Sequence, residues 1–363
     1  MKNIVIGVSL APYRVDYYNS LHDRMDCEIF FQKKAFADQL FSTEEITGQC
    51  TYTPRYLKTI SLGKSRCLCL GLRKLIRELR PDFIISNEFS IVTIQLILLR
   101  WFSAHKFKII SQCDDSFDML VNEAFSQLHE WSQRLCMKYI DDIILLDNKA
   151  EGWYRQKYSK GFFFPLIINE KNIDSKLREE VQSKAGALRQ TYGLESRHTI
   201  LFAGRFVEVK NLFTLIDACA ILGAQYRLVL VGDGELRAAL EHYAAGKGID
   251  ALFPGRCNGA ELYAWYASAD CFVLPSLKEA FGAVTNEAMV FGCNCCVSSS
   301  AGSSILVEEG KNGYICNPHS AEDIALQISK TVLLPVNPGR GTKMIYSFDS
   351  CMDRLETMLS GQK

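Results

Sequence analysis

The most constraining feature of this 363-residue sequence is the repeated order of an apolar run, a polar loop and an amphipathic helical pattern. In the first half, the apolar run at 2–9 ends in a loop that precedes apolar residues at helical spacing. The second half repeats this order after apolar runs at 199–203, 226–231 and 271–274. Alternating strands and helices favour parallel sheets that are covered on both faces. The sequence therefore predicts an α/β protein with doubly wound sheets.

A charged stretch at 169–196 separates the two series and predicts a domain junction. A chain of this length fits two domains of ordinary size. We expect Rossmann-like domains at 1–168 and 169–345, and a last helix at 346–363 that packs back toward the first domain. A polar segment at 35–56 predicts a long loop. The GxGxxG pattern of dinucleotide-binding domains does not follow the first strand.

The stretch at 271–287, CFVLPSLKEAFGAVTNE, predicts a strand, a loop that carries Glu279, and a helix from about Thr285 with Glu287 near its start. Open α/β sheets bind ligands where strands end and helices begin, and helix amino termini favour anions. Two carboxylates suit sugar or ribose hydroxyls, because an ionised carboxylate only accepts hydrogen bonds. The stretch therefore predicts a ligand that is part phosphate and part polyol, such as a nucleotide sugar.

A second strand exit carries positive charge. Gly204 and Arg205 follow the run at 199–203, and Lys210 lies close to the start of the next helix. A planar guanidinium and a lysine beside a glycine at a strand-to-helix turn form the outline of a phosphate site. Solvated loop charges are the alternative interpretation.

Composition excludes several classes of protein. The 41 basic residues balance the 41 acidic ones, which argues against a nucleic-acid partner. An apolar strand directly after Met1 and fourteen scattered cysteines predict a cytoplasmic protein with free thiols. The cysteine spacing does not fit paired zinc ligands. The longest apolar run, at 91–99, is too short to cross a bilayer.

A basic block extends from Arg55 to Arg80, with eight Lys or Arg residues and one acid, Glu78. Leucine and isoleucine residues from Leu68 onward recur at helical spacing and predict an amphipathic basic helix from 70 to 79. In one interpretation, its basic side is exposed to solvent and its apolar side faces the core. Alternatively, it docks on anionic lipid, which would place the protein peripherally on the inner face of the membrane.

The second half resembles the retaining glycosyltransferases of family 4, the glycosyl transferases group 1, over about 200–318. The resemblance implies a GT-B fold, with an acceptor-binding first domain and a nucleotide-sugar-binding second domain facing across a cleft. It also implies transfer of a sugar to an acceptor hydroxyl with retention, in cell-surface polysaccharide or lipopolysaccharide assembly. The matching motifs are Gly204-Arg205, Lys210-Asn211, Val231-Gly232-Asp233-Gly234, Gly255, Tyr263, Ala269-Asp270, Leu274-Pro275-Ser276, Glu279, Phe281-Gly282, Glu287-Ala288, Gly292 and 308–313.

The resemblance also implies roles for individual residues. Arg205 and Lys210 would hold the donor diphosphate and stabilise the charge of the leaving group. Glu279 would contact the transferred sugar, and Glu287 would bind the ribose. Because basic side chains neutralise the diphosphate, we expect no metal and no cofactor. The remaining donor-binding residues would be Gly204, Phe281, Gly282, Ala283 and Val284 beside the sugar and phosphates, and Arg256 and Cys257 near the base.

The first half resembles the family more loosely. Pro12-Tyr13-Arg14 resembles a branch that uses this loop near the acceptor, which places Tyr13 and Arg14 on the acceptor side. Many relatives have a histidine after the strand that matches 108–112, but this sequence has Cys113-Asp114-Asp115 there. We take Asp114 as the substitute, and a helix cap by Asp115 or Ser116 is the alternative role for this segment.

Three rival functions stay open at this point. A non-catalytic nucleotide-sugar binder would use the same site, and a nicotinamide-dependent reductase would use the same type of sheet. An inverting glycosyltransferase would need a general base in the first domain, such as Asp114 or Asp16. The acceptor is a glycan, a lipid-linked oligosaccharide or a small molecule, and the sequence identifies neither the donor base nor the donor sugar.

Overall fold

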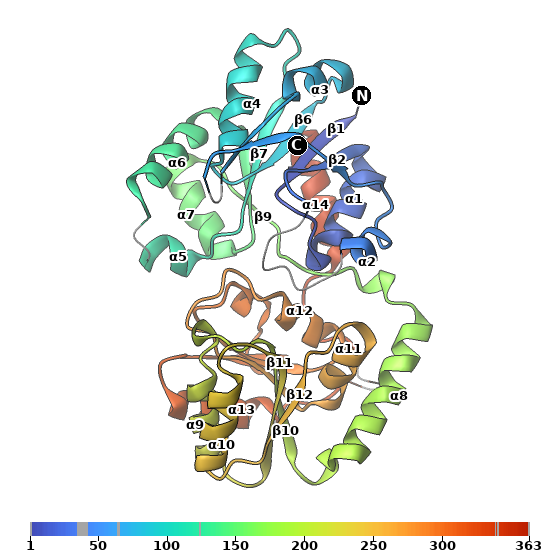
Figure 1. Cartoon of the computed structure of the whole chain (residues 1–363), viewed down its shortest axis with the longest axis vertical. Helices are drawn as coiled ribbons and strands as arrows, with labels where there is room; N and C mark the ends of the chain where they lie inside the picture. Colours follow the sequence, from blue (N-terminus) through green and yellow to red (C-terminus); the bar gives the residue numbers. More distant parts are fainter. Residues whose placement is uncertain are drawn as a thin grey trace. The chain divides into compact units, whose positions relative to one another are not determined.

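The computed structural model describes residues 2–34, 43–63, 66–122, 125–337, 339 and 341–361. The chain divides into two compact units, Met1–Ile168 with Asp349–Lys363 (unit 1) and Asn169–Phe348 (unit 2). Each unit is built around a parallel sheet flanked by helices (Figure 1). The predicted α/β class is therefore confirmed. Residues 35–42 of the predicted loop lie outside the described residues.

Unit 1 contains a seven-stranded parallel sheet in the order β3-β2-β1-β6-β7-β8-β9. Continuous apolar runs form its central strands, because parallel strands are buried on both faces. The strands are β1 (Asn3–Gly7), β2 (Cys27–Phe31), β3 (Arg55–Tyr56), β6 (Phe83–Asn87), β7 (Lys108–Cys113), β8 (Asp142–Leu145) and β9 (Phe162–Phe163). The helices are the 3-10 helix η1 (Pro12–Arg14), α1 (Val15–Met25), α2 (Thr43–Thr47), α3 (Leu72–Leu79), α4 (Ile91–Phe102), α5 (Phe117–Asn122), α6 (Gln127–Tyr139), α7 (Asn148–Tyr158) and α14 (Phe348–Ser360).

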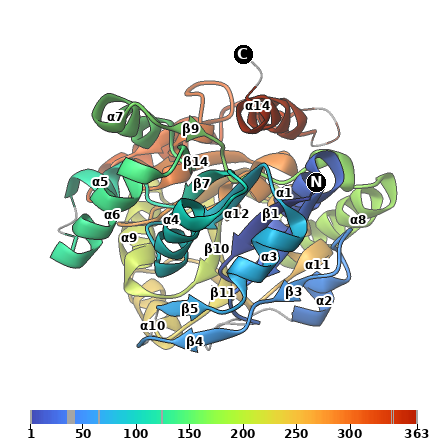
Figure 2. The same cartoon turned by 90° about the horizontal axis from the view of Figure 1, so that it is seen from above.

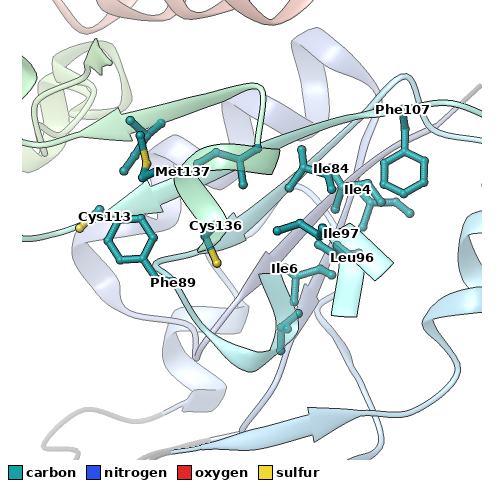
Figure 3. Close-up of a cluster of buried hydrophobic side chains, with 14 of the residues drawn as sticks. Ile4, Ile6, Ile84, Phe89, Leu96, Ile97, Phe107, Cys113, Cys136 and Met137 are labelled. Atoms are coloured by element: carbon teal, nitrogen blue, oxygen red, sulfur yellow. The ribbon is translucent and has the colours of Figure 1, made fainter. Parts of the chain in front are cut away.

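The core of unit 1 follows from the two-residue period of its strands. Ile4 and Ile6 of β1 point to the same face of the sheet, where they join Ile84 of β6. Leu96 and Met137 bring α4 and α6 onto this cluster (Figure 3). The apolar sides of these helices and of the sheet thus form one continuous core.

The last helix, α14, completes unit 1. Met352 and Leu355 are fully buried, and Leu359 is 2% exposed. On the surface, Arg24 of α1 forms ion pairs with Asp353 and with Glu356, the latter at 3.0 Å. The chain therefore returns to unit 1 after it has built unit 2.

Unit 2 contains a six-stranded parallel sheet in the order β12-β11-β10-β13-β14-β15. Helices α9, α10 and α13 cover one face, and α8 and α11 cover the other (Figure 1). The strands are β10 (His198–Arg205), β11 (Tyr226–Asp233), β12 (Ala251–Gly255), β13 (Cys271–Leu274), β14 (Asn294–Ser298) and β15 (Gly313–Cys316). The helices are η2 (Glu170–Asn172), α8 (Ser175–Tyr192), η3 (Leu194–Ser196), η4 (Glu208–Lys210), α9 (Leu212–Leu222), α10 (Arg237–Gly246), α11 (Gly259–Ser268), α12 (Ala283–Val290), η5 (Gly302–Leu306) and α13 (Ala321–Thr331).

The basic block of unit 1 differs from the prediction. Its helix begins at Leu72, and the residues before it form an antiparallel hairpin of β4 (Thr59–Ser61) and β5 (Cys67–Cys69). Leu68 therefore lies in a strand rather than in the helical pattern assigned to it. The hairpin was missed because each strand is only three residues long, and Leu68 and Leu72 happen to have helical spacing.

Candidate functional site

The strand order of unit 2 sets the position of the site. From β10 the chain continues to β11 and β12 on one side, and it then returns to place β13 on the other side of β10. Ligands of open α/β sheets bind at this kind of switch point, outside the carboxyl ends of the strands. The predicted site residues lie at these two strand exits. Arg205 ends β10 and Lys210 lies in η4 just after it, whereas Glu279 lies in the loop after β13 and Glu287 lies in α12.

Glycines allow the strand exits to approach closely. Gly232 of β11 has a φ of +140°, and a Cβ atom there would lie 1.9 Å from the carbonyl oxygen of Gly204. Gly204 itself has a φ of +155°. Side chains cannot be accommodated in this backbone conformation without strain. The motif Gly232-Asp233-Gly234 therefore serves close packing against the end of β10, where Arg205 is exposed and lies opposite Asp233.

The loops after β10 and β13 are hydrogen-bonded to each other. The Asn211 side chain donates to the carbonyl oxygens of Pro275 at 3.2 Å and Pro318 at 2.6 Å. The Leu277 N–H donates to the Val209 carbonyl at 2.9 Å. Asn211 has a φ of +58°, a left-handed conformation that asparagine tolerates better than most residues. This framework fixes Lys210 in front of the loop after β13.

Lys210 and Glu279 form an ion pair across the switch point. Their side chains are 15% and 19% exposed, so the pair is largely removed from water. Charges in such surroundings interact more strongly than exposed ones. The structure thus brings together two predicted site residues that are 69 positions apart in the sequence.

The segment at 301–303 supports the loop that carries Glu279. The Gly302 N–H donates to the Glu279 carbonyl at 3.1 Å, and the Ser303 N–H donates to the Phe281 carbonyl at 2.7 Å. Gly282 has a φ of +92° and precedes α12, which begins at Ala283, about two residues before the predicted start. Phe281 is buried, whereas 282–284 are partly exposed beside the helix start.

Glu287 is the fifth of the eight residues of α12 and accepts a hydrogen bond from the buried Tyr266 hydroxyl at 3.1 Å. Burial raises the pKa of Glu287 to about 7, although the Tyr266 hydroxyl acts in the opposite direction. This carboxyl group therefore changes its charge near neutral pH, and ionising it in the folded protein opposes stability as pH rises toward 7.

Arg256 and Cys257 follow β12, at the outer side of the sheet. The Arg256 side chain is 54% exposed and lies 3.8 Å from Asp233. Cys257 is buried just before α11, and burial raises the pKa of its thiol to about 11. The Arg256 side chain thus lies at the surface near Asp233, while Cys257 contributes to packing.

Unit 1 has its own switch point, between β1 and β6. Arg14, in the short helix after β1, donates two hydrogen bonds to the Asp114 carboxylate at 2.5 and 2.6 Å. The Gln112 side-chain oxygen also accepts from Arg14, with Nη2 at 3.0 Å. Only 7% of the Arg14 side chain is exposed, against 39% for Asp114. The buried Arg14 therefore fixes the position of the Asp114 carboxylate. Tyr13, the residue before it, is 41% exposed.

Glu88 is a candidate that the sequence reasoning did not single out. It follows β6 and has a φ of +50°. The hydroxyl groups of Ser111 and Thr93 donate to its carbonyl at 2.7 and 2.9 Å. Burial raises the pKa of Glu88 to about 7, with Asp114 among the neighbouring charges that act in the same direction. The apolar run at 82–86 predicts a strand, and the position of Glu88 two residues after this run was the available signal.

Several expectations concern metals, thiols and membranes. Within the described residues, no group of three or more His, Cys, Asp or Glu side chains is arranged to hold a metal ion. All fourteen cysteines are free, and thirteen are buried. None of the helices in the described ranges is sufficiently long and apolar to span a bilayer.

Comparison with known sequences agrees with this site. Residues 186–340 match the family described as Glycosyl transferases group 1. Sulfoquinovosyl transferase SQD2 of Arabidopsis thaliana is 30% identical over 167 residues, which cover 45% of this chain and 32% of that protein. The lipopolysaccharide core biosynthesis glycosyltransferase LpsE of Rhizobium meliloti is 34% identical over 137 residues, or 37% and 39% of the two chains. The chain thus spans only about a third of the length of these relatives.

Comparison with solved structures covers the whole chain. HepE of Anabaena, solved in complex with UDP, has a TM-score of 0.77 and 17% identity, and the match covers 99% of this chain and 100% of that one. WaaG, a glycosyltransferase involved in lipopolysaccharide biosynthesis, has a TM-score of 0.61 and 14% identity over 99% and 100% of the two chains. These similarities confirm the predicted fold class. The chain therefore has the GT-B fold, and its residues 186–340 match the family described as Glycosyl transferases group 1.

Proposed function

We propose that this protein transfers a sugar from a nucleoside diphosphate sugar to an acceptor hydroxyl group. The observation that carries the proposal is the Lys210–Glu279 pair at the switch point of unit 2, with Arg205 at the end of the adjoining strand. The similarity of this segment to a sulfoquinovosyl transferase and to a lipopolysaccharide core biosynthesis glycosyltransferase supports it. Under this proposal unit 2 binds the donor, and unit 1 binds the acceptor.

The chemistry follows from the charges at the site. As the bond between the anomeric carbon and the diphosphate breaks, negative charge develops on the departing oxygen. Lys210 and Arg205 stabilise that charge. Donors that are already in position are most effective, because they need not reorganise during the reaction. Glu279, beside Lys210, accepts hydrogen bonds from the hydroxyl groups of the sugar. The two cations take the part that a metal ion has in other transferases.

Finer features belong to the same proposal. The motif spacing supports assignment to family 4 and retention of the anomeric configuration. UDP and UDP-glucose in the solved HepE complexes favour a uridine donor. On the acceptor side, Asp114 held by Arg14 takes the place of the expected histidine, with Tyr13 beside it. The reaction contributes to the assembly of cell-surface polysaccharide or lipopolysaccharide. It takes place in the cytoplasm, at the inner face of the membrane.

The direct test is a screen of UDP, GDP and their sugars by thermal shift, followed by assays of nucleotide release. A ligand that binds only the folded protein raises the melting temperature by mass action. We expect stabilisation by one nucleotide and release of that nucleotide from its sugar donor. Stabilisation without release in the presence of varied acceptors would instead indicate a non-catalytic binder. Product NMR then distinguishes retention from inversion.

Donor binding should depend on the charge of Glu287. Between pH 6 and 8 the carboxyl group ionises, because burial raises its pKa to about 7. A ribose hydroxyl donates a stronger hydrogen bond to an ionised carboxylate than to a neutral acid. We expect UDP affinity to rise on the order of fivefold over this range, measured by calorimetry.

The matched control for this pH dependence is Glu287→Gln. UDP also titrates near pH 6, and the variant retains that contribution while it removes the carboxylate. The difference between the two pH profiles therefore isolates Glu287. Parallel profiles for the natural protein and Glu287→Gln would contradict a contact between Glu287 and the ribose.

A further inference from the structure

The β4–β5 hairpin of unit 1 has its aliphatic side chains on the outer face. Ile60 pairs with Leu68, and Ser61 pairs with Cys67. Since side chains alternate along a strand, Leu62 and Leu70 lie on the same face as this first pair. The opposite face is the inner one: Cys67 and Cys69 are 5% and 2% exposed. We call Ile60, Leu62, Leu68 and Leu70 the aliphatic face.

The hairpin carries apolar side chains on its outer face as well as on its inner one. An antiparallel ribbon that covers a core normally turns its apolar side inward and its polar side to water. Here Ile60, Leu62 and Leu70 are 49%, 48% and 44% exposed. A group of exposed apolar side chains on one small element is typical of an interaction surface.

The surroundings of the aliphatic face are positively charged. Helix α3 begins two residues after Leu70 and exposes Arg73, Lys74 and Arg77, while it buries its own apolar side chains in the core. Figure 2 shows β4, β5 and α3 next to one another in unit 1. The sequence has no Asp or Glu from 46 to 77. Glu78, 3.8 Å from Lys74, is the first acid after this stretch.

We propose that the aliphatic face and the basic side of α3 form a docking surface for an anionic phospholipid bilayer. Exposed apolar side chains next to a basic helix fit the boundary between acyl chains and charged headgroups. Docking would hold the enzyme beside an acceptor carried in the membrane, and this role rests on the proposed function. It also refines the sequence-based expectation: the basic helix supplies charge, and the hairpin supplies the inserting side chains.

The test measures flotation of the full chain with phosphatidylcholine vesicles, with and without phosphatidylglycerol. We expect binding that depends on the anionic lipid. Each basic side chain near such a surface contributes about fivefold to affinity, so Arg73→Gln/Lys74→Gln/Arg77→Gln should weaken binding on the order of 100-fold. Ile60→Thr/Leu62→Thr should also weaken it, because the inserted apolar area is lost.

Matched controls come from unit 2. Lys176→Gln/Lys184→Gln removes exposed charge from α8, and Ile221→Gln/Leu326→Gln removes side chains that are 54% and 50% exposed. Both should bind vesicles like the natural protein. Equal binding by the hairpin variant and its control would overturn the proposal. So would a solution dimer that Ile60→Thr/Leu62→Thr dissociates, because the face would then belong to a second copy. Vesicle binding without nucleotide release would count against the proposed function alone.

Discussion

Lys210→Ala should reduce sugar transfer by about 100-fold or more while the protein stays folded. The lysine is the cation that the structure fixes against the loop after β13, through the hydrogen bonds of Asn211 and Val209. Loss of one preorganised donor to developing negative charge typically costs on the order of 100-fold or more in turnover. The measurement is steady-state nucleotide release with and without acceptor, and we expect the loss mainly in kcat.

A suitable control for this variant is Lys247→Ala. Lys247 also pairs with a carboxylate, that of Asp217 at 2.8 Å. However, it lies in the connection between α10 and β12, away from the switch point. Its removal should leave turnover unchanged. Near-normal turnover of Lys210→Ala would show that the phosphate site lies elsewhere.

Deletion of 349–363 should unfold unit 1 and leave unit 2 folded. The deleted helix buries Cys351, Met352, Leu355 and Leu359 against unit 1. Full burial of a large apolar side chain contributes about 1.5–3 kcal/mol, so the total approaches the whole stability of an ordinary domain. Calorimetry should show the loss of one unfolding transition, while the transition that UDP shifts should persist.

A single substitution gives a graded form of the same test. Leu355→Ala should lower the free energy of unfolding of unit 1 by about 2–5 kcal/mol, because Leu355 is fully buried. Leu326→Ala, at a leucine that is 50% exposed, should change stability by no more than about 0.5 kcal/mol. Two unchanged transitions after removal of the helix would contradict the assignment of α14 to the core of unit 1.

Sequence reasoning succeeded where a local pattern was sufficient. The short apolar run at 294–298, between a glycine and a serine-rich loop, predicts a strand, and β14 has these bounds. The amphipathic pattern at 122–139 predicts one long helix, and this prediction is wrong at its start. Ser126 caps α6 through the His129 N–H, and the preceding residues belong partly to α5.

The site was predictable as a set of strand ends, but not as a set of contacts. The Lys210–Glu279 pair requires β13 to return beside β10, and the Arg14–Asp114 pair, 100 residues apart, likewise requires the strand order of unit 1. No spacing in the sequence encodes that order. Glu88 escaped notice for a different reason, since its left-handed backbone depends on two buried hydroxyl groups from other elements.

The return of the chain to unit 1 has a consequence for synthesis on the ribosome. Unit 2 is continuous in sequence, whereas unit 1 is interrupted between Ile168 and Asp349. Domains generally fold as units, and amino-terminal ones usually fold first during translation. In this chain the order of completion is reversed: unit 2 can close its core while the nascent chain is still attached. Unit 1 must wait with an exposed apolar groove until the final helix leaves the exit tunnel, which makes it the unit that chaperones would protect.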